Sequence, residues 1–356
     1  MGFSVGIVGL PNVGKSTLFK TLTKKEIDIS NYPFCTIDPN VGIVKVPDER
    51  LEKLTTFSES AKTIPTAIEF VDIAGLVKGA HKGEGLGNKF LSNIREVDMI
   101  VHIVRGFENG KIIHVHNEVN PDDDVDAINT ELILSDLETI EKRLSKIEKE
   151  VRSGDKNSIA LKAILEKYKN ALENEKMANS VELDEKEQEL TREFQLLTNK
   201  PILYVVNVNE SQKISEENIL PNIENKIFLP IQFELDLADL SPEEVADFRQ
   251  EANIDSQISS IENLITKCYD LLGLITFLTT GKDETRAWTI KKGSTAPQAG
   301  SAIHSDFEEK FIRASVINWQ KLIEAGSLGN AVEKGLLRTE GKNYIVQDGD
   351  VIEFKI

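Results

Sequence analysis

The chain has 356 residues, of which 40% are hydrophobic, so it is long enough to build about two or three domains with packed cores. Its formal net charge is −17, which excludes bulk electrostatic coating of nucleic acid, so any contact with RNA has to be local. The two cysteines, Cys35 and Cys268, lack metal-ligand spacing, and no run of about 18 apolar residues suggests a membrane span. We therefore expect a soluble, cytoplasmic protein with reduced thiols that binds neither membranes nor free DNA.

Short apolar runs bounded by turn residues recur along the chain, with helical or loop segments between them. They cover residues 3–10, 68–73, 99–104, 201–208 and 227–231. Short runs that are apolar throughout are typical of parallel strands buried on both faces. Their alternation with helical segments predicts an α/β fold.

A long polar insertion separates the third run from the fourth, at about residues 129–199. Apolar residues recur within it at alternating steps of four and three, which is a heptad pattern. They are Ile133, Leu137, Ile140, Leu144, Ile147 and Val151. We predict a helical hairpin with a return helix, which is either a self-packed structural arm or a coiled coil that binds a partner.

The pattern changes again after about residue 273. Residues 286–290 alternate as a strand, residues 306–311 favour a helix, and residues 350–354 favour a last strand. Strands and helices in this order predict a small, separate α+β domain at the end of the chain.

Residues 9–16, GLPNVGKS, match the pattern G-x-x-x-x-G-K-[ST] directly after an apolar strand and before a predicted helix. The glycines let backbone N–H groups curl around phosphate oxygens at a helix N-terminus. Lys15 reaches the β- and γ-phosphates and contributes to catalysis, and the Ser16 hydroxyl joins the ligands of Mg²⁺. The predicted nucleotide-binding residues of this loop are Asn12, Val13, Gly14, Lys15, Ser16 and Thr17.

Asp72 and Gly75 form a D-x-x-G motif at the end of the second apolar run. In a P-loop enzyme an aspartate at this position lies near Mg²⁺, and the glycine N–H can meet the γ-phosphate. Upstream, Thr36 offers the hydroxyl of a first switch loop. We predict that Ser16, Thr36 and Asp72 hold Mg²⁺, and that Lys15 and Gly75 act on the transferred phosphate.

The fourth apolar run ends in the sequence NVNE at 207–210, where GTPases carry N-K-x-D. In that motif the aspartate accepts two hydrogen bonds from guanine, and the lysine stem covers the base. Here Val208 replaces the lysine and Glu210 the aspartate, and a longer carboxylate cannot take the same position against guanine. We predict contacts with the base from Asn207, Val208 and Glu210, without strict specificity for GTP.

Together these motifs resemble those of the Obg-like ATPases of the YchF type, a branch of the translation-factor-related P-loop GTPases, over essentially the whole chain. The segments that carry the resemblance are GLPNVGKST at 9–17, NYPFCTIDPN at 31–40, FVDIAGLVKGA at 70–80, KGEGLGNKF at 82–90, NVNE at 207–210, RAWTI at 286–290 and STAPQAG at 294–300. The chain departs from the usual small residues of the family after the fifth strand, where it has Gln232, Phe233 and Glu234.

The resemblance implies an Obg-type G domain over residues 3–251, interrupted by a helical coiled-coil arm, and a C-terminal TGS domain of the β-grasp type over residues 273–356. It implies hydrolysis of ATP in preference to GTP, with Mg²⁺ as cofactor. It also implies association with the ribosome or its large subunit, in the regulation of translation or of a stress response. Asn12 resembles the asparagine of potassium-stimulated relatives, which makes K⁺ a second candidate cation.

The group that positions the attacking water is not the glutamine of Ras-like enzymes, because Leu76 occupies that place after the D-x-x-G motif. The resemblance to the family assigns the role to His114, on the loop after the third strand. His116 and His81 are substitutes, and the alternative is that His114 is an ordinary loop histidine.

Two classes of function stay open. The chain is either an enzyme whose hydrolysis resets a ribosome-bound state, or a nucleotide-gated adaptor whose arm and TGS domain act while hydrolysis is incidental. An enzyme that prefers GTP is a further alternative.

Overall fold

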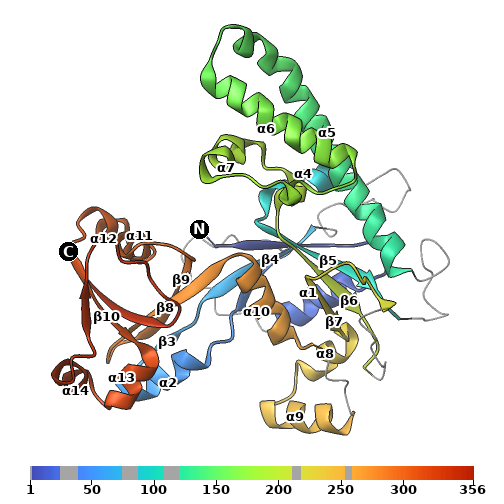
Figure 1. Ribbon diagram of the computed structural model, residues 1–356. Helices are drawn as coiled ribbons and strands as arrows, with labels where there is room; N and C mark the ends of the chain where they lie inside the picture. Colours follow the sequence, from blue (N-terminus) through green and yellow to red (C-terminus); the bar gives the residue numbers. More distant parts are fainter. Residues whose placement is uncertain (1, 25–38, 74–86, 108–119, 211–217, 253–258) are drawn as a thin grey trace.

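The strands form two separate sheets in the computed structural model, which describes residues 2–24, 39–73, 87–107, 120–210, 218–252 and 259–356 (Figure 1). The first sheet has the order β2-β4-β1-β5-β6-β7, in which β2 runs antiparallel to β4 and the other neighbours are parallel. Its strands are β1 (Ser4–Val8), β2 (Val41–Lys45), β4 (Ala67–Asp72), β5 (Met99–Arg105), β6 (Ile202–Asn207) and β7 (Lys226–Leu229). All five predicted strands lie in this sheet, which confirms the α/β fold.

Helices cover both faces of the first sheet. On one face they are α1 (Lys15–Thr23), α8 (Ile231–Leu237) and α10 (Ile261–Leu271). On the other they are α4 (Asn88–Glu96) and the first turns of α5 (Pro121–Arg152). The strand β5 is buried along its whole length, with Ile103 packed toward the first group and Val104 toward the second. Burial on both faces explains why continuous apolar runs mark these strands in the sequence.

Beyond the sheet, α5 continues as one side of a helical arm (Figure 1). The helix starts at Pro121, which suits a first helical position, and the Asn120 side chain accepts a hydrogen bond from the N–H of Asp122. The chain turns back at Gly154, where φ is +83°, and Asp155 caps the next helix. The remaining helices of the arm are α6 (Lys156–Glu173), η2 (Ala178–Ser180), α7 (Glu185–Thr191), η3 (Arg192–Phe194) and η4 (Leu197–Asn199).

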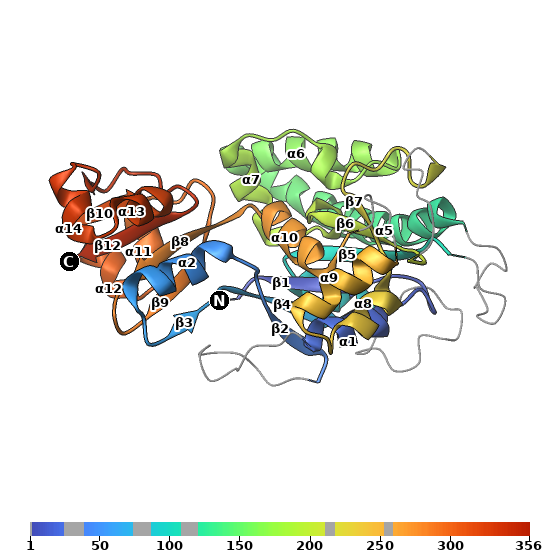
Figure 2. The same cartoon turned by 90° about the horizontal axis from the view of Figure 1, so that it is seen from below.

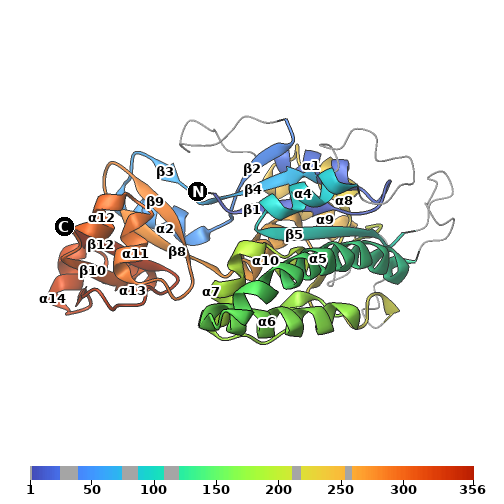
Figure 3. The same cartoon turned by 90° about the horizontal axis from the view of Figure 1, so that it is seen from above.

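The heptad residues of α5 face α6, and the two helices lie side by side (Figure 3). Ile133, Ile140 and Ile147 are buried, and the three heptad residues between and after them are partly buried. The predicted hairpin is therefore confirmed. Because the chain's own α6 covers the seam, the structure favours a self-packed arm over a coiled coil that is open to a partner.

Polar contacts hold the first half of α5 to η4 and to α4, which covers the first sheet. Asp136 is buried, and its carboxylate accepts hydrogen bonds from Leu197 N (2.9 Å), Thr198 N (2.8 Å) and the Thr198 hydroxyl (2.7 Å). Arg95, in the last turn of α4, donates to the Ser135 hydroxyl of α5 (3.1 Å). A buried carboxylate with three donors holds one geometry, so the arm starts from a rigid base.

The second sheet has the order β11-β10-β12-β8-β9-β3. Its strands are β3 (Thr63–Ile64), β8 (Leu274–Thr280), β9 (Thr285–Lys291), β10 (Arg313–Asn318), β11 (Arg338–Glu340) and β12 (Asp350–Lys355). The helices on one face are α11 (Ala296–Ser301) and α12 (Ser305–Glu309). Those on the other are α2 (Glu49–Ser58), α13 (Trp319–Ala325) and α14 (Leu328–Glu333). Neighbouring residues of β8 alternate between them, with Phe277 on the first side and Leu278 on the second.

The strand β3 of the second sheet and the helix α2 that packs on that sheet both come from the chain before β4. The sequence patterns did not predict that α2 and β3 pack in this domain. The strands predicted at 286–290 and 350–354 are confirmed as β9 and β12. The helix expected at 306–311 is shorter and ends at Glu309. The domain limits 3–251 and 273–356 remain a prediction. None of the described helices combines the length and the apolar character needed to cross a membrane.

Candidate nucleotide site

The loop between β1 and α1 is shaped by three residues with positive φ, which is +151° at Gly9, +64° at Asn12 and +111° at Gly14. A Cβ at Gly9 would lie 2.5 Å from the Ile103 carbonyl oxygen, and one at Gly14 would lie 2.6 Å from Asn207 Nδ2. Both the torsions and the close approach therefore require glycine at these two positions.

The loop leads Lys15, Ser16 and Thr17 into the first turn of α1. Val13 is 1% exposed and anchors the loop in the core, whereas Ser16 is exposed and Thr17 is half-buried. The first N–H groups of a helix lack partners within the helix and carry the positive end of its dipole. The exposed first turn of α1 is therefore suited to bind phosphate.

The Lys15 ammonium group lies against the same loop, where Nζ donates a hydrogen bond to the Leu10 carbonyl oxygen (2.5 Å). Burial lowers the pKa of Lys15 to about 8, although the negative charge of Asp72 acts in the opposite direction. Lys15 follows the loop after β1 and Asp72 ends the neighbouring parallel strand β4, so both residues lie at one edge of the first sheet.

Asp72 is the last residue of β4, which runs parallel to β1 with Ile7 opposite Asp72. Its side chain is buried, and its backbone N–H donates to the Asn40 carbonyl oxygen (2.9 Å). Parallel strands place their carboxyl ends at one edge of the sheet, which is where open α/β sheets bind ligands. The Ser16 hydroxyl and the Asp72 carboxylate offer oxygen atoms as metal ligands at this edge, and Mg²⁺ prefers oxygen ligands.

Asn207, at the end of β6, braces the phosphate-binding loop. Its Nδ2 donates to the Val13 carbonyl oxygen (3.0 Å), and its Oδ1 accepts from the N–H of Ile231 (3.2 Å), at the start of α8. The side chain is 7% exposed. Asn207 therefore holds the loop to α8, and its contact with a base remains a prediction.

The other two residues predicted to contact the base differ in exposure. Val208 is 4% exposed and packs in the core with Val206 and Phe228, and its N–H donates to the Leu229 carbonyl oxygen (3.2 Å). Glu210 is exposed. Only the carboxylate is therefore free to turn toward a ligand without repacking the core.

The unusual residues at 232–234 lie in α8. Gln232 is exposed and donates to Asp236 within the helix (2.9 Å). Glu234 is 6% exposed, forms an ion pair with Arg249 of α9 (Pro242–Glu251), and accepts a hydrogen bond from the N–H of Ile261 (3.1 Å). Glu234 thus joins three helices and is not directed by these contacts toward a base.

Five residues with predicted roles in catalysis or metal binding lie outside the described residues. They are Thr36, Gly75, His81, His114 and His116. Their roles remain predictions from the sequence.

The sequence analysis assigned no role to His102, which interrupts the apolar run of β5. Its ring is 1% exposed, lies 5.3 Å from the Tyr204 ring, and has no hydrogen-bond partner for Nε2 among the described residues. Burial, and to a smaller extent the charge of Lys15, lower the pKa of His102 to about 3. The ring is therefore neutral at physiological pH and does not repel Lys15. Its one sequence signal is its place as the single polar residue of that run.

The lowered pKa of Lys15 predicts that the affinity for Mg·ATP falls with rising pH. Below pH 8 most of the free protein carries a protonated Lys15, which is the form that binds phosphate. Above pH 8 Lys15 is mostly neutral, so it has to take up a proton when the nucleotide binds. We expect the affinity to fall by about tenfold between pH 7 and pH 9, as measured by titration calorimetry. Lys15→Arg, which stays charged, should bind more weakly but without this dependence. A constant affinity in the parent protein would contradict the prediction.

Comparisons with known proteins agree with this geometry. A family model described as 50S ribosome-binding GTPase matches residues 4–146. A second model, of a YchF GTPase C-terminal family described as a protein of unknown function (DUF933), matches residues 274–356.

Relatives match over the whole length. The chain is 51% identical to the Ribosome-binding ATPase YchF of Bacillus subtilis (strain 168), over 100% of this chain and 99% of the relative. It is 48% identical to the protein of the same name from Escherichia coli O157:H7, over 99% of each chain. The structure of the Schizosaccharomyces pombe YchF GTPase is similar, with a TM-score of 0.88, 35% identity and coverage of 99% and 98% of the two chains.

The parallel sheet, the glycine loop at the start of α1 and Asp72 at the same edge define a P-loop nucleoside triphosphatase. The sequence identity of about one half to the YchF relatives, over the full length of the chain, defines a narrower group than this class. The chain belongs to the YchF family.

Proposed function

We propose that this protein hydrolyses ATP to ADP and phosphate in a Mg²⁺-dependent reaction, and that it regulates translation or a stress response on the ribosome. The observation that carries the hydrolytic part is the placement of Lys15 and Asp72 at one edge of the first sheet. The name Ribosome-binding ATPase, given to the bacterial relatives, supports the ribosomal part. The description of the family model for residues 4–146 points to the large subunit. The proposed binding to ribosomes supports a cytoplasmic location.

In this proposal the backbone of residues 12–17 surrounds the phosphates, and Lys15 and the Gly75 N–H contact the γ-phosphate. Ser16, Thr36 and Asp72 hold Mg²⁺, which neutralises phosphate charge when it is bound. The positive end of α1 adds to this stabilisation without any rearrangement. K⁺ near Asn12 is a finer proposal, supported by the identity of that residue alone.

ATP is the proposed substrate, and GTP binds more weakly. The support is the replacement of the guanine-holding aspartate by Glu210, which is exposed three residues after the end of β6. Val208 supports it as well, since a buried valine cannot cover the base as a lysine stem does.

The double variant Val208→Lys with Glu210→Asp should shift the ratio of ATP to GTP affinity toward GTP by about tenfold or more, because a charged hydrogen bond contributes about 1.5–3 kcal/mol. Competition between the two nucleotides for the protein measures this ratio. The single variant Glu210→Asp is the control, since it leaves the packing of Val208 intact. An unchanged ratio in a double variant that melts like the parent would argue against the proposed base contacts.

Multiple-turnover hydrolysis of ATP with and without ribosomes tests the function. The proposal expects ribosomes to raise the rate. Ribosome binding that depends on nucleotide, with hydrolysis that ribosomes leave unchanged, would instead support the nucleotide-gated adaptor. A higher rate with GTP than with ATP would support the GTP-preferring alternative.

A further inference from the structure

The chain between two predicted Mg²⁺ ligands, Thr36 and Asp72, passes through the C-terminal sheet. It forms β2 at the edge of the first sheet, leaves that sheet, and returns as β4 with Asp72 at its end. β2 and β4 pair along their length, and Val46 N donates to the Thr66 carbonyl oxygen (2.9 Å) where both strands leave the sheet. Figure 2 shows the intervening α2 and β3 beside the C-terminal strands.

The helix α2 supplies part of the C-terminal core. Leu51 and Leu54 are 4% and 0% exposed, and they pack with Leu278, Ile317 and Leu322 of the C-terminal domain. Pulling α2 away would expose both leucines, which the hydrophobic effect opposes. The helix therefore moves together with the C-terminal sheet.

The strand β3 adds hydrogen bonds to the same connection. It pairs in parallel with β9, with Thr63 opposite Thr285. Just before β3, Ala61 N donates to the Lys282 carbonyl oxygen (2.9 Å), and Thr285 N donates to the Lys62 carbonyl oxygen (2.9 Å). Residues 48–64 are thus part of the C-terminal domain in space, although they lie between the two predicted metal ligands in sequence.

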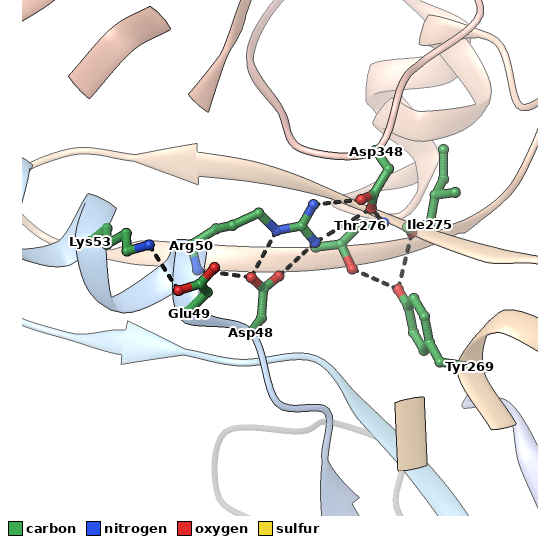
Figure 4. Close-up of polar contacts among 8 residues, drawn as sticks. All are labelled: Asp48, Glu49, Arg50, Lys53, Tyr269, Ile275, Thr276 and Asp348. Atoms are coloured by element: carbon green, nitrogen blue, oxygen red, sulfur yellow. Dashed lines mark hydrogen bonds and ion pairs between the residues drawn. The ribbon is translucent and has the colours of Figure 1, made fainter. Parts of the chain in front are cut away.

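Arg50 closes this connection between two carboxylates (Figure 4). Its Nε and Nη2 each lie 2.8 Å from an oxygen of Asp48, at the start of α2, and its Nη1 lies 2.5 Å from Asp348 Oδ2. The other oxygen of Asp348 accepts from Thr276 N of β8 (2.9 Å), and the Thr276 hydroxyl is 2.8 Å from the Tyr269 hydroxyl of α10. Burial disfavours a charged guanidinium, but the hydrogen bonds to Asp48 and Asp348 outweigh it and raise the pKa of Arg50. One charged group therefore links α2 to the C-terminal loop at Asp348, and through β8 to α10 on the first sheet.

We propose that residues 46–66, held by the contacts of Arg50 with Asp48 and Asp348, couple the nucleotide site to the C-terminal domain. The coupling rests on the proposed function, because it needs Asp72 at the end of β4 to take part in binding Mg·ATP. Binding of Mg·ATP at Asp72 orders the end of the β2–β4 ribbon where Val41 pairs with Val71, and the other end of the same ribbon carries α2 and β3. A ligand that orders one end lowers the entropic cost of order at the other. By reciprocity, loosening the C-terminal contacts weakens nucleotide binding by the same factor.

Backbone hydrogen exchange with Mg²⁺ and a non-hydrolysable ATP analogue tests the coupling in the full chain. In the parent protein we expect the analogue to slow exchange in residues 48–64 and 343–355 by about fivefold or more. Arg50→Gln and Asp348→Asn should abolish this slowing in residues 343–355 and weaken analogue affinity by about the same factor. Glu49→Gln is the matched control, since Glu49 pairs with Lys53 within α2 (2.8 Å) and should behave as the parent does.

The outcomes separate the coupling from the function. Binding of the analogue without any change of exchange in residues 343–355 would overturn the coupling alone, and so would an unchanged nucleotide effect in both variants. A parent protein that binds no Mg²⁺ with the analogue would overturn the proposed function and the coupling with it. Hydrogen exchange measured without nucleotide shows whether each variant is folded. Because Arg50→Gln and Asp348→Asn remove the same ion pair from opposite sides, one variant can still test the coupling if the other does not fold.

Discussion

Replacing Lys15 by alanine should weaken the binding of Mg·ATP by about a hundredfold or more, because each charged hydrogen bond to phosphate contributes about 1.5–3 kcal/mol. The fold should survive, since β1 and α1 are held by buried apolar side chains such as Ile7 and Leu18, which the replacement leaves in place. Titration calorimetry with ATP in the presence of Mg²⁺ measures the loss. Circular dichroism of the same sample shows whether the fold is intact.

Ser16→Ala removes the hydroxyl predicted to bind Mg²⁺, and its effect should appear as a loss of metal dependence. ATP affinity in this variant should change little when EDTA is added, whereas the parent should lose most of its affinity. Lys20→Ala and Thr23→Ala are matched controls in the last turns of the same helix. Parental affinity and turnover in both Lys15→Ala and Ser16→Ala would rule out the P-loop as the nucleotide site.

Local patterns were sufficient to predict five of the six strands of the first sheet, without β2, and the phosphate-binding loop. The apolar runs are strands because both faces of the sheet are covered, and the glycines of the loop are required by close approaches to Ile103 and Asn207. The heptad pattern likewise placed Ile133, Ile140 and Ile147 against α6. The strands, the glycine motif and the heptad pattern can each be recognised from residues near one another in sequence or from one periodic pattern, whereas the contacts that require the glycines are long-range.

The sequence could not show that α2 and β3 belong to the second sheet. β3 has two residues, and its pairing with β9 joins positions that are more than two hundred residues apart. The ion pair between Arg50 and Asp348 likewise joins residues that are far apart in sequence. Such pairings depend on tertiary packing, which propensity and periodicity do not encode.

The sequence also did not predict which partners the polar side chains near the predicted nucleotide base have. The N-x-x-E segment gave the position of Asn207, but not that its amide is used by Val13 and Ile231. Glu234 lies in the segment expected to border the base, yet its carboxylate binds Arg249 and the N-terminus of α10. A motif therefore predicts which residues approach the site, while the partners of each polar atom decide what remains available to a ligand.

Histidine is the residue type that the family resemblance assigns to the attacking water, and the described part of the chain narrows the choice. His102 is buried within the central strand β5, and His304 caps α12 in the C-terminal domain, where its Nδ1 accepts from Asp306 N (3.2 Å). His102 is 1% exposed and so does not present its ring to a water in solvent, and His304 lies outside the first sheet and its helices. The remaining candidates are His81, His114 and His116.

His114→Ala should lower the rate of ATP hydrolysis by about ten- to a thousandfold, the range that a lost positioning or acid–base group commonly costs, with little change in ATP affinity. Single-turnover hydrolysis at saturating enzyme separates the chemical step from product release, and calorimetry gives the affinity. His116→Ala, two residues along the same segment, is the matched control and should keep the parental rate. If His114→Ala also keeps it, the assignment is wrong and His81, which follows the D-x-x-G motif, is the next residue to replace. A slow His81→Ala variant with unchanged affinity would then assign the water-positioning role to the segment that follows Asp72 in sequence.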